Sequence, residues 1–403
     1  MLKNPNLVAN VVTECKNFPI RFQYLVRDKI QILRKYIQYV LFLSGLGTVS
    51  IVLFGVIDVY FGSKPLNCLD LEIQPGRVRV LTSHLEGNRI RWWVAEDNQG
   101  LRTFTCPVEN CNDRTLFSDE RTYLNSETVL AVAWNQAFNQ PEEIWVSTSE
   151  GTLAKLKKQR NQNSWKQTSR FQQPYCPAST MVVQPNKLEL GAAHSTQPRL
   201  YSFDKKQKWS DSQLLDIHEN INLRVTSMIV NEDARTTWVG TKEGLYRVGS
   251  GRAGSSIHPP WVDIQDPFSF QIQALAIDSK KNIWVGTKKQ GLLLFNPITN
   301  NWNPPLPGIP SQEITAISLS KSNQIALIGT DNGLSVCKWK ESNETYRCSH
   351  IDDEKFNNKE IEAINLASNM TAAIYVEKKL EILDKQILLG KITTVNSLTS
   401  FYQ

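Results

Sequence analysis

The sequence predicts an all-β protein: a seven-bladed β-propeller of four-stranded blades, preceded by one transmembrane α-helix and a short basic N-terminal helical segment. Three observations lead to this prediction: a tandem repeat, a second apolar strand before each copy of the repeat, and one long uncharged stretch. The repeat is clearest at residues 282–295, where an apolar strand, a Gly-bearing turn and another apolar strand follow one another.

Seven copies of this pattern follow one another along the chain. The residues equivalent to Trp284 lie 43 to 52 positions apart and are Trp93, Trp145, Glu189, Trp238, Trp284, Leu327 and Ala373. A period in the forties, with several short strands in each unit, is typical of a β-propeller.

A shorter apolar run precedes each copy, and we expect it to form the innermost strand of its blade. The seven runs are residues 77–80, 129–134, 180–183, 225–230, 272–277, 314–319 and 361–366. This strand, the repeat strand, its hairpin partner and a variable outer strand make four strands per blade.

Individual positions of the repeat have physical reasons. The residue two positions after the Trp is small, as expected where neighbouring sheets crowd together: Ala95, Ser147, Gly191, Gly240, Gly286 and Gly329. Tyr375 breaks this pattern, so we expect the last blade to be irregular. Positive φ in the hairpin turns suits Gly244, Gly291 and Gly333. We expect the Trp residues at the repeat position to fill the gaps between adjacent blades; these are Trp93, Trp145, Trp238 and Trp284.

The chain before the repeats divides into two segments. Residues 1–36 are basic and have apolar residues at roughly helical spacing, which suits a cytoplasmic topology signal and lipid-headgroup contact better than a nucleic-acid site. Residues 36–57 hold no charge, and these 22 positions span about 33 Å as a helix. We therefore expect domains at 1–36, 37–61 (transmembrane) and 62–403 (propeller).

The transmembrane helix is expected to be an uncleaved signal anchor. About 36 residues precede it, and no small-residue cleavage pattern follows it. Its basic flank would stay in the cytoplasm, which places the propeller on the other side of the membrane. A bacterial inner membrane with a periplasmic propeller is the expected location, and a thylakoid membrane with a lumenal propeller is the alternative.

Cysteine placement agrees with an oxidising compartment. Cys15 precedes the anchor, and the other six follow it. Cys106 with Cys111, and Cys337 with Cys348, bracket equivalent links between third and fourth strands, so we expect two hairpin disulfides. Cys68 and Cys176 form a candidate third pair; unpaired buried thiols are the alternative. The ring could close by pairing residues 69–73 with residues 391–398.

The strings W-V-G-T-K-E-G-L-Y-R from Trp238 and W-V-G-T-K-K-Q-G-L-L-L-F from Trp284 resemble the two-component regulator propeller repeat. So does the lead-in G-I-P-S-Q-E-I at residues 308–314. The resemblance implies an extracytoplasmic, ligand-recognising propeller of the kind found in membrane histidine kinases. The predicted cytoplasmic tail is too short for a kinase domain, so the binding platform is what we expect to carry over.

In a propeller, the turns between second and third strands share a face with the blade-to-blade connections, and ligands or partners dock on this face. The candidate binding residues there are Asp97, Glu150, His194, Lys242, Glu243, Lys288, Lys289, Asp331 and Lys378. Ordinary solvated turn residues are the alternative interpretation. The basic residues are in excess at blades four, five and seven, and Lys242, Lys288 and Lys289 are the first candidates for contact with an acidic partner or ligand.

Catalysis has little support in the sequence. The five histidines (His84, His194, His218, His258 and His350) stand at no metal-ligand spacing from another His or Cys. No phosphate-binding or nucleophile motif occurs. Propeller lyases resembling virginiamycin B lyase use a metal-assisted His centre on this face, and only His194 falls there. We expect no catalytic residue, metal or cofactor.

The sequence therefore predicts a membrane-anchored, non-catalytic sensor or scaffold that binds a protein, peptide or glycan outside the cytoplasm, and no nucleic acid. One alternative is an assembly or stability factor for a membrane complex, respiratory or photosynthetic. The other is a propeller lyase or hydrolase, for which loss of activity in a His194→Ala variant would be the sign.

Overall fold

The computed structural model describes most of the chain between residues 73 and 397. The described ranges are 73–74, 76–111, 118–124, 127–134, 143–159, 164–174, 176–192, 199–212, 225–231, 236–249, 252–253, 256–263, 269–320, 324–340, 345–383, 388 and 396–397. The predicted basic segment 1–36 and transmembrane segment 37–61 lie outside these ranges. Within them, no helix has the length and hydrophobicity needed to cross a bilayer.

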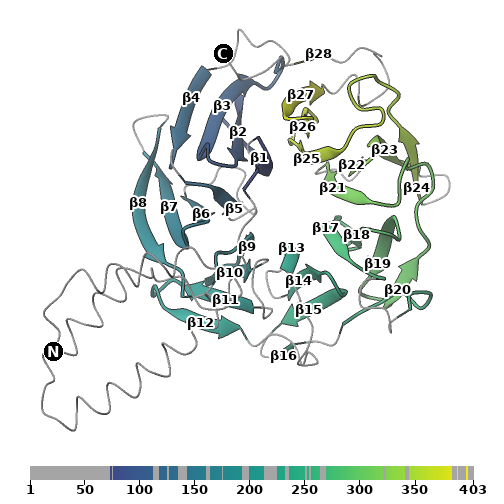
Figure 1. Cartoon of the computed structure of the whole chain (residues 1–403), viewed down its shortest axis with the longest axis horizontal. Coiled ribbons are helices and arrows are strands. Elements are labelled where there is room, and N and C mark those ends of the chain that lie inside the picture. Colours follow the sequence, from purple (N-terminus) through teal and green to yellow (C-terminus); the bar gives the residue numbers. More distant parts are fainter. Residues whose placement is uncertain are drawn as a thin grey trace, which may run out of the picture. The chain divides into compact units, whose positions relative to one another are not determined.

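The described chain forms seven four-stranded antiparallel sheets, arranged as the blades of a propeller around a central axis (Figure 1). Blade one contains β1 (Val78–Glu86), β2 (Arg89–Glu96), β3 (Leu101–Pro107) and β4 (Ser118–Tyr123). Blade two contains β5 (Val129–Ala133), β6 (Glu143–Thr148), β7 (Thr152–Lys158) and β8 (Trp165–Gln172). Blade three contains β9 (Thr180–Val183), β10 (Lys187–Ala192), β11 (Arg199–Asp204) and β12 (Trp209–Ser212).

The remaining four blades repeat this order. Blade four contains β13 (Val225–Val230), β14 (Thr236–Thr241), β15 (Leu245–Gly249) and β16 (Arg252–Ala253). Blade five contains β17 (Ile272–Ile277), β18 (Ile283–Thr287), β19 (Leu292–Asn296) and β20 (Asn301–Asn303). Blade six contains β21 (Ile314–Leu319), β22 (Ile325–Thr330), β23 (Gly333–Lys340) and β24 (Thr345–His350). Blade seven contains β25 (Ile361–Leu366), β26 (Ala372–Val376), β27 (Lys379–Leu383) and β28 (Asn396–Ser397). The predicted seven-bladed, four-stranded architecture is confirmed.

The innermost strand of blade one is the clearest departure from the predicted strand bounds. The expected strand at 77–80 is the start of β1, which continues to Glu86 and pairs with β2 as far as Arg89. The second half of β1 mixes polar and apolar residues, so it does not appear as an apolar run. A tight turn at Gly87, with φ of 63°, ends this long hairpin.

A β-bulge occurs near the start of the innermost strand in six of the seven blades. The register shifts at Val78/Val80, Val129/Ala131, Val225/Ser227, Ile272/Ala274, Ile314/Ala316 and Ile361/Ala363. A bulge leaves one residue without a partner across the strand pair and redirects its side chain. The bulged residues are Arg79, Leu130, Thr226, Gln273, Thr315 and Glu362.

The small position two residues after the Trp lies where one blade meets the next, as predicted. A Cβ placed on Gly286 would lie 2.6 Å from Ile314 Cγ2, and one on Gly240 would lie 2.6 Å from Ile272 Cγ2. Ile314 and Ile272 each begin the innermost strand of the following blade. The absence of a side chain therefore lets adjacent sheets approach closely.

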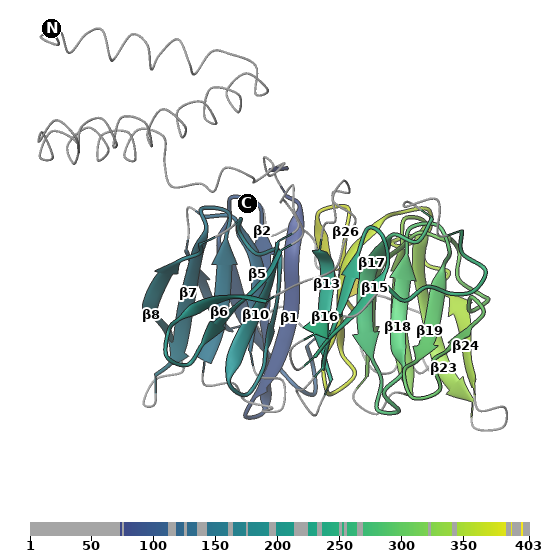
Figure 2. The same cartoon turned by 90° about the horizontal axis from the view of Figure 1, so that it is seen from below.

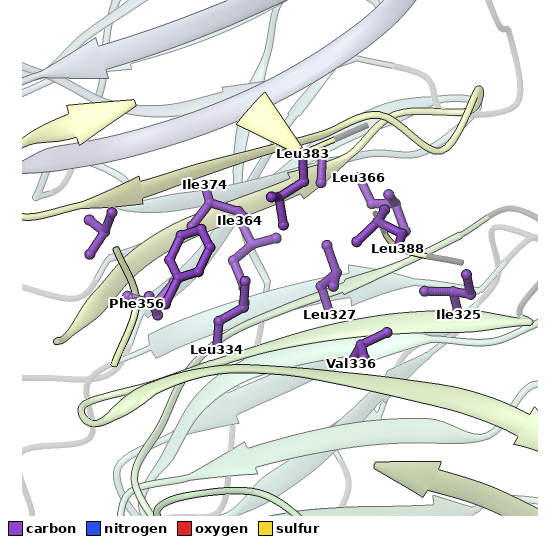
Figure 3. Close-up of a cluster of buried hydrophobic side chains, with 13 residues drawn as sticks. Ile325, Leu327, Leu334, Val336, Phe356, Ile364, Leu366, Ile374, Leu383 and Leu388 are labelled. Atoms are coloured by element: carbon purple, nitrogen blue, oxygen red, sulfur yellow. The ribbon is translucent and has the colours of Figure 1, made fainter. Parts of the chain in front are cut away.

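The hydrophobic core is divided among the interfaces between adjacent blades. Figure 3 shows the interface of blades six and seven, where Leu327 and Leu334 face Ile364 and Ile374, and Phe356 closes one end. Trp93 and Trp284 are fully buried and Trp238 nearly so, as predicted. Trp145 is only partly buried and packs against Phe203.

The ring closes through side chains, because each of the seven sheets consists of four strands consecutive in the chain. β28 lies within the expected closing segment 391–398, but it pairs only with β27 of its own blade; residues 69–72 lie outside the described ranges. The expected irregularity of the last blade is wrong for strand order, which matches the other blades, and for its bulge, which lies where five other blades have one. Tyr375 is buried and packs with Trp92 and Ile90 of blade one. Its bulk fills the closing interface.

Both predicted hairpin disulfides are present. Cys106 is bonded to Cys111 with a Cα–Cα distance of 5.0 Å, and Cys337 is bonded to Cys348 with a Cα–Cα distance of 3.9 Å. Cys337 and Cys348 stand directly opposite each other on β23 and β24. Cys176 is also disulfide-bonded. Its predicted partner, Cys68, lies outside the described residues.

Candidate functional site

The turns between second and third strands lie on the same face as the blade-to-blade connections. The register shows this in blade five, where Thr287 at the end of β18 pairs with Ile272 at the start of β17. Figure 2 shows the strands running between this face and the opposite one, which carries the other hairpin turns. We call the first the turn-bearing face and define it by the turns 97–100, 149–151, 242–244, 288–291, 331–332 and 377–378.

A buried threonine holds the turn in three of the blades. Thr287 donates its hydroxyl to the carbonyl of Gly291 at 2.9 Å and accepts a bond from the backbone N–H of Gln290 at 2.8 Å. Thr241 and Thr330 make equivalent bonds in blades four and six. Gly244, Gly291 and Gly333 in these turns have φ of 151°, 73° and 123°. Glycine adopts such positive φ values more readily than other residues, which explains why it occupies these positions. The T of the W-V-G-T string therefore fixes the turn conformation.

Five of the candidate residues have exposed side chains on this face: Glu150, Lys288, Lys289, Asp331 and Lys378. The stem of Lys378 packs over Gly76, where an added Cβ would lie 2.8 Å from Lys378 Cδ. Lys288 and Lys289 form no ion pair with any described residue. Their ammonium groups are open to solvent and to a partner.

Asp97 is occupied by the fold itself. Its carboxylate accepts two bonds from the Arg79 guanidinium, at 2.7 and 2.8 Å, and a third from the backbone N–H of Gln74 at 2.9 Å. Its side chain is fully buried. Asp97 therefore holds Gln74, which precedes β1, against blade one. A ligand has no access to the buried Asp97 carboxylate. His194 lies outside the described residues.

Lys242 and Glu243 are partly exposed on the blade-four turn. Burial raises the pKa of the Glu243 carboxyl to about 7, because the low-polarity surroundings disfavour its charged form. The same carboxylate contributes, after burial, to raising the pKa of Tyr246 to about 12. Lys242 already takes part in a further interaction. This turn therefore carries little net negative charge near neutral pH.

Four of the six bulged residues (Thr226, Gln273, Thr315 and Glu362) bond to the next blade or to the connection that leads into it, a role that no sequence pattern predicts. Thr226 Oγ1 donates to the carbonyl of Ile272 at 2.7 Å, and Thr315 Oγ1 donates to that of Ile361 at 2.6 Å. Glu362 accepts a bond from the backbone N–H of Val78 at 3.5 Å, across the ring closure. These four side chains join neighbouring blades, whereas Arg79 bonds to Asp97 of its own blade and Leu130 is apolar and buried.

A separate polar network joins blades two and three. Gln173 donates to Ser147 Oγ and to the carbonyl of Thr152, both at 3.0 Å, and its Oε1 accepts bonds from Ala178 N and Tyr201 OH. Every polar atom of this buried amide has a partner. The network is fully satisfied and has the properties of a structural element.

The described histidines, His84, His258 and His350, each form a hydrogen bond within the fold. His84 is buried beside Trp93, Trp134 and Trp165, and its Nδ1 is 3.2 Å from Trp93 Nε1. Burial is the main cause that lowers its pKa to about 4. No group of three His, Cys, Asp or Glu side chains suited to a metal ion occurs among the described residues.

Comparison with known proteins supports the fold. No protein-family model and no curated protein sequence matches the chain. The extracellular domain of BT4673 of B. thetaiotaomicron, described as a one-component system, is similar over 78% of this chain with a TM-score of 0.54 and 18% identity. The similar region covers 39% of that chain. The β-propeller domain of Cps50 (Swd1) from Myceliophteria thermophila is similar over 78% of this chain and 99% of its own length, with a TM-score of 0.52 and 11% identity.

At such low identities, these similarities establish a propeller fold and carry no function with them. Membership of the two-component regulator propeller repeat family stays a prediction.

Proposed function

We propose that this chain is a membrane-anchored binding module, a sensor or scaffold without catalytic activity, that recognises a protein, peptide or glycan through its turn-bearing face. The observation that carries this proposal is the pair of exposed, unpaired lysines, Lys288 and Lys289, on a turn fixed by the buried Thr287. A turn already held in one backbone conformation loses little backbone freedom on binding, which favours recognition.

We further propose that the propeller lies outside the cytoplasm, anchored by residues 37–61. Two disulfides in the described chain and a third bonded cysteine, Cys176, support an oxidising compartment. Alkaline phosphatase fused after Gln403 should be active in a bacterial host, and β-galactosidase fused at the same point should be inactive. The reverse pattern would contradict the proposed orientation.

The binding function is tested with the full chain in detergent. Chemical cross-linking and capture from membrane extracts should recover a partner, and a screen of peptides and glycans by thermal shift should find ligands. The charge-reversed variant Lys288→Glu/Lys289→Glu should lose the partner or ligand while keeping its melting temperature. Absence of any ligand or partner in both screens would count against a binding module. Co-migration of the captured partner with a larger membrane complex would favour an assembly factor instead.

A further inference from the structure

The connection between blades four and five presents an exposed tryptophan on the turn-bearing face. Trp261 lies in the described segment 256–263 and exposes 45% of its surface. Only two other large apolar residues are as exposed among the described ones: Ile73 and Ile298. Ile298 follows β19 and therefore lies on the opposite face. An exposed indole offers a large apolar area to another molecule, and tryptophan is enriched at protein interfaces.

Hydrogen bonds hold this connection against the blade-four turn. His258 Nε2 lies 2.7 Å from the carbonyl oxygen of Glu243, and the imidazole fills the space beside Gly244. The backbone N–H of Ile257 donates to the carbonyl of Leu245 at 2.7 Å, which extends the sheet edge at this point. One end of the connection is therefore fixed to blade four.

The other end is fixed to blade five. Ser269 Oγ donates to the carbonyl of Asp263 at 2.6 Å, and Gln290 Nε2 donates to the carbonyl of Ser269 at 3.5 Å. The backbone N–H of Lys288 donates to the carbonyl of Gln271 at 2.9 Å. Val262, next to Trp261, is buried in the core cluster shared by blades four and five. Trp261 therefore stands on a fixed segment between the 242–244 and 288–291 turns.

The charge around the indole is mainly positive. Lys288 and Lys289 are exposed and have no ion-pair partner among the described residues, and Lys242 lies on the other side. Among the described residues of this connection and of its two flanking turns, the acidic groups are Glu243 and Asp263. Glu313, on the following connection, accepts a bond from Gln273 Nε2. The raised pKa of Glu243 reduces its charge near neutral pH, and Asp263 already takes part in a further interaction. The unengaged charges are those of the two lysines.

We propose that the surface formed by Lys242, Trp261, Lys288 and Lys289, here called the Trp261 surface, binds an acidic, extended segment of a protein partner. An apolar side chain of that segment would pack on the indole, and its carboxylates would contact the Lys288 and Lys289 ammonium groups. This inference rests on the proposed binding function and names its location and the chemistry of the partner. Lysine contacts of this kind weaken as salt rises.

The probes are short fluorescein-labelled peptides in which Glu alternates with Phe, Lys alternates with Phe, or Glu alternates with Ser. Their binding to the full chain in detergent is measured by fluorescence anisotropy. The Glu-Phe peptide should bind about tenfold or more tightly than the other two, because only it offers both charge and an aromatic ring. Its affinity should fall as the salt concentration is raised.

Two variants test the surface, and two matched variants control for it. Trp261→Ala and Lys288→Gln/Lys289→Gln should each weaken binding of the Glu-Phe peptide by about tenfold, and the lysine variant should also flatten the salt dependence. Ile298→Ala and Lys205→Gln/Lys206→Gln remove an exposed apolar residue and an exposed lysine pair from turns on the opposite face. These controls should bind as the unaltered protein does.

Equal binding of the three peptides, or equal affinity in all four variants, would overturn the Trp261 surface. A partner captured by the full chain whose binding ignores Trp261→Ala and Lys288→Gln/Lys289→Gln would also overturn it, but would leave the proposed binding function standing. Failure to find any ligand in peptide and glycan screens would instead remove the binding function itself.

Discussion

At the scale of single residues, the closest contacts between blades occur where a side chain is missing. Gly191, Gly240, Gly286 and Gly329 occupy equivalent positions in four blades, and a Cβ on any of them would meet a side chain of the next blade at 2.6 to 2.8 Å. Such distances fall below ordinary van der Waals contact. The glycine of the repeat therefore marks the place where neighbouring sheets pack most closely.

Gly286→Ala should lower the free energy of unfolding by about 1–3 kcal/mol, because the added methyl overlaps Ile314. Urea denaturation measures this loss. Combining it with Ile314→Ala should cost less than the sum of the two single changes, since the overlapping methyl has been removed. Strict additivity would show that the two residues do not interact.

His84 should make the stability of the protein depend on pH. Its pKa is about 4 in the folded protein, against 6.5 as the ordinary value, so the unfolded chain binds more protons between these limits. Stability should therefore fall as the pH is lowered from 6.5 towards 4, by up to about 3 kcal/mol from this residue.

The His84 contribution is isolated by comparison with His84→Gln, which keeps an acceptor for the Trp93 indole N–H. The difference in unfolding free energy between the two proteins, measured by urea denaturation across this pH range, should change steadily with pH. A difference that stays constant from pH 7 to pH 4 would rule out a buried neutral imidazole.

At the scale of the strand, the innermost strand both lines the ring and joins its neighbours. In four blades the bulged residue is polar and bonds to the next blade or to its lead-in, as Thr315 does to the carbonyl of Ile361. A carbonyl left without this donor would lie in a part-buried interface. The bulge therefore joins adjacent blades at these four places, from blade four to the junction with blade one.

Thr315→Val keeps the shape of the side chain and removes the hydroxyl, so it should lower the unfolding free energy by about 1–2 kcal/mol. Thr168, whose hydroxyl makes an exposed bond to the carbonyl of Lys155, offers a matched control. Thr168→Val should change stability by less than about 0.5 kcal/mol. Equal losses in the two variants, measured by thermal unfolding, would argue against a joining role for Thr315.

Apolar patterning predicts the innermost strands well, because their apolar residues form short runs in the sequence. In the structure these strands are only partly buried, less so than the second strands of the blades. Five of the innermost strands have the predicted bounds: β9, β13, β17, β21 and β25. Outer strands face solvent on one side and vary from two residues in β16 to eight in β8, so no common pattern marks them. Tertiary packing sets their length.

The sequence predicts where the candidate site lies, but only in part which of its side chains are exposed. The turns followed from the repeat, which is why exposed residues such as Lys288 were found. Burial of Asp97 depends on Arg79, a bulged residue whose direction no local pattern reveals. Trp261 lies in a connection without a repeat, so its exposure could be seen only in three dimensions.

At the scale of the whole molecule, the ring is closed by packing and hydrogen bonds between blades seven and one. Tyr375 fills the space where four other blades have glycine, and Asn369 Nδ2 donates to the carbonyl of Val108 at 2.7 Å. In the described chain, no strand is exchanged across this junction. Stability of the closed ring should therefore depend strongly on a few side chains.

Tyr375→Ala should lower the unfolding free energy by about 3–5 kcal/mol, because it leaves a cavity in the closing interface. Tyr375→Phe retains the ring of the side chain and should recover most of this loss. Chemical denaturation with the disulfides intact measures both. A loss below about 1 kcal/mol in Tyr375→Ala would mean that the closing interface contributes little.

The unbroken strand order within each sheet also bears on how the protein is made. Every sheet is complete once its own fourth strand has left the ribosome, so early blades need not wait for the C-terminus. Hairpins formed between adjacent segments close short loops, which favours their rapid formation. Folding can thus proceed blade by blade during synthesis. Only the junction between the first and last sheets has to wait until blade seven has been made.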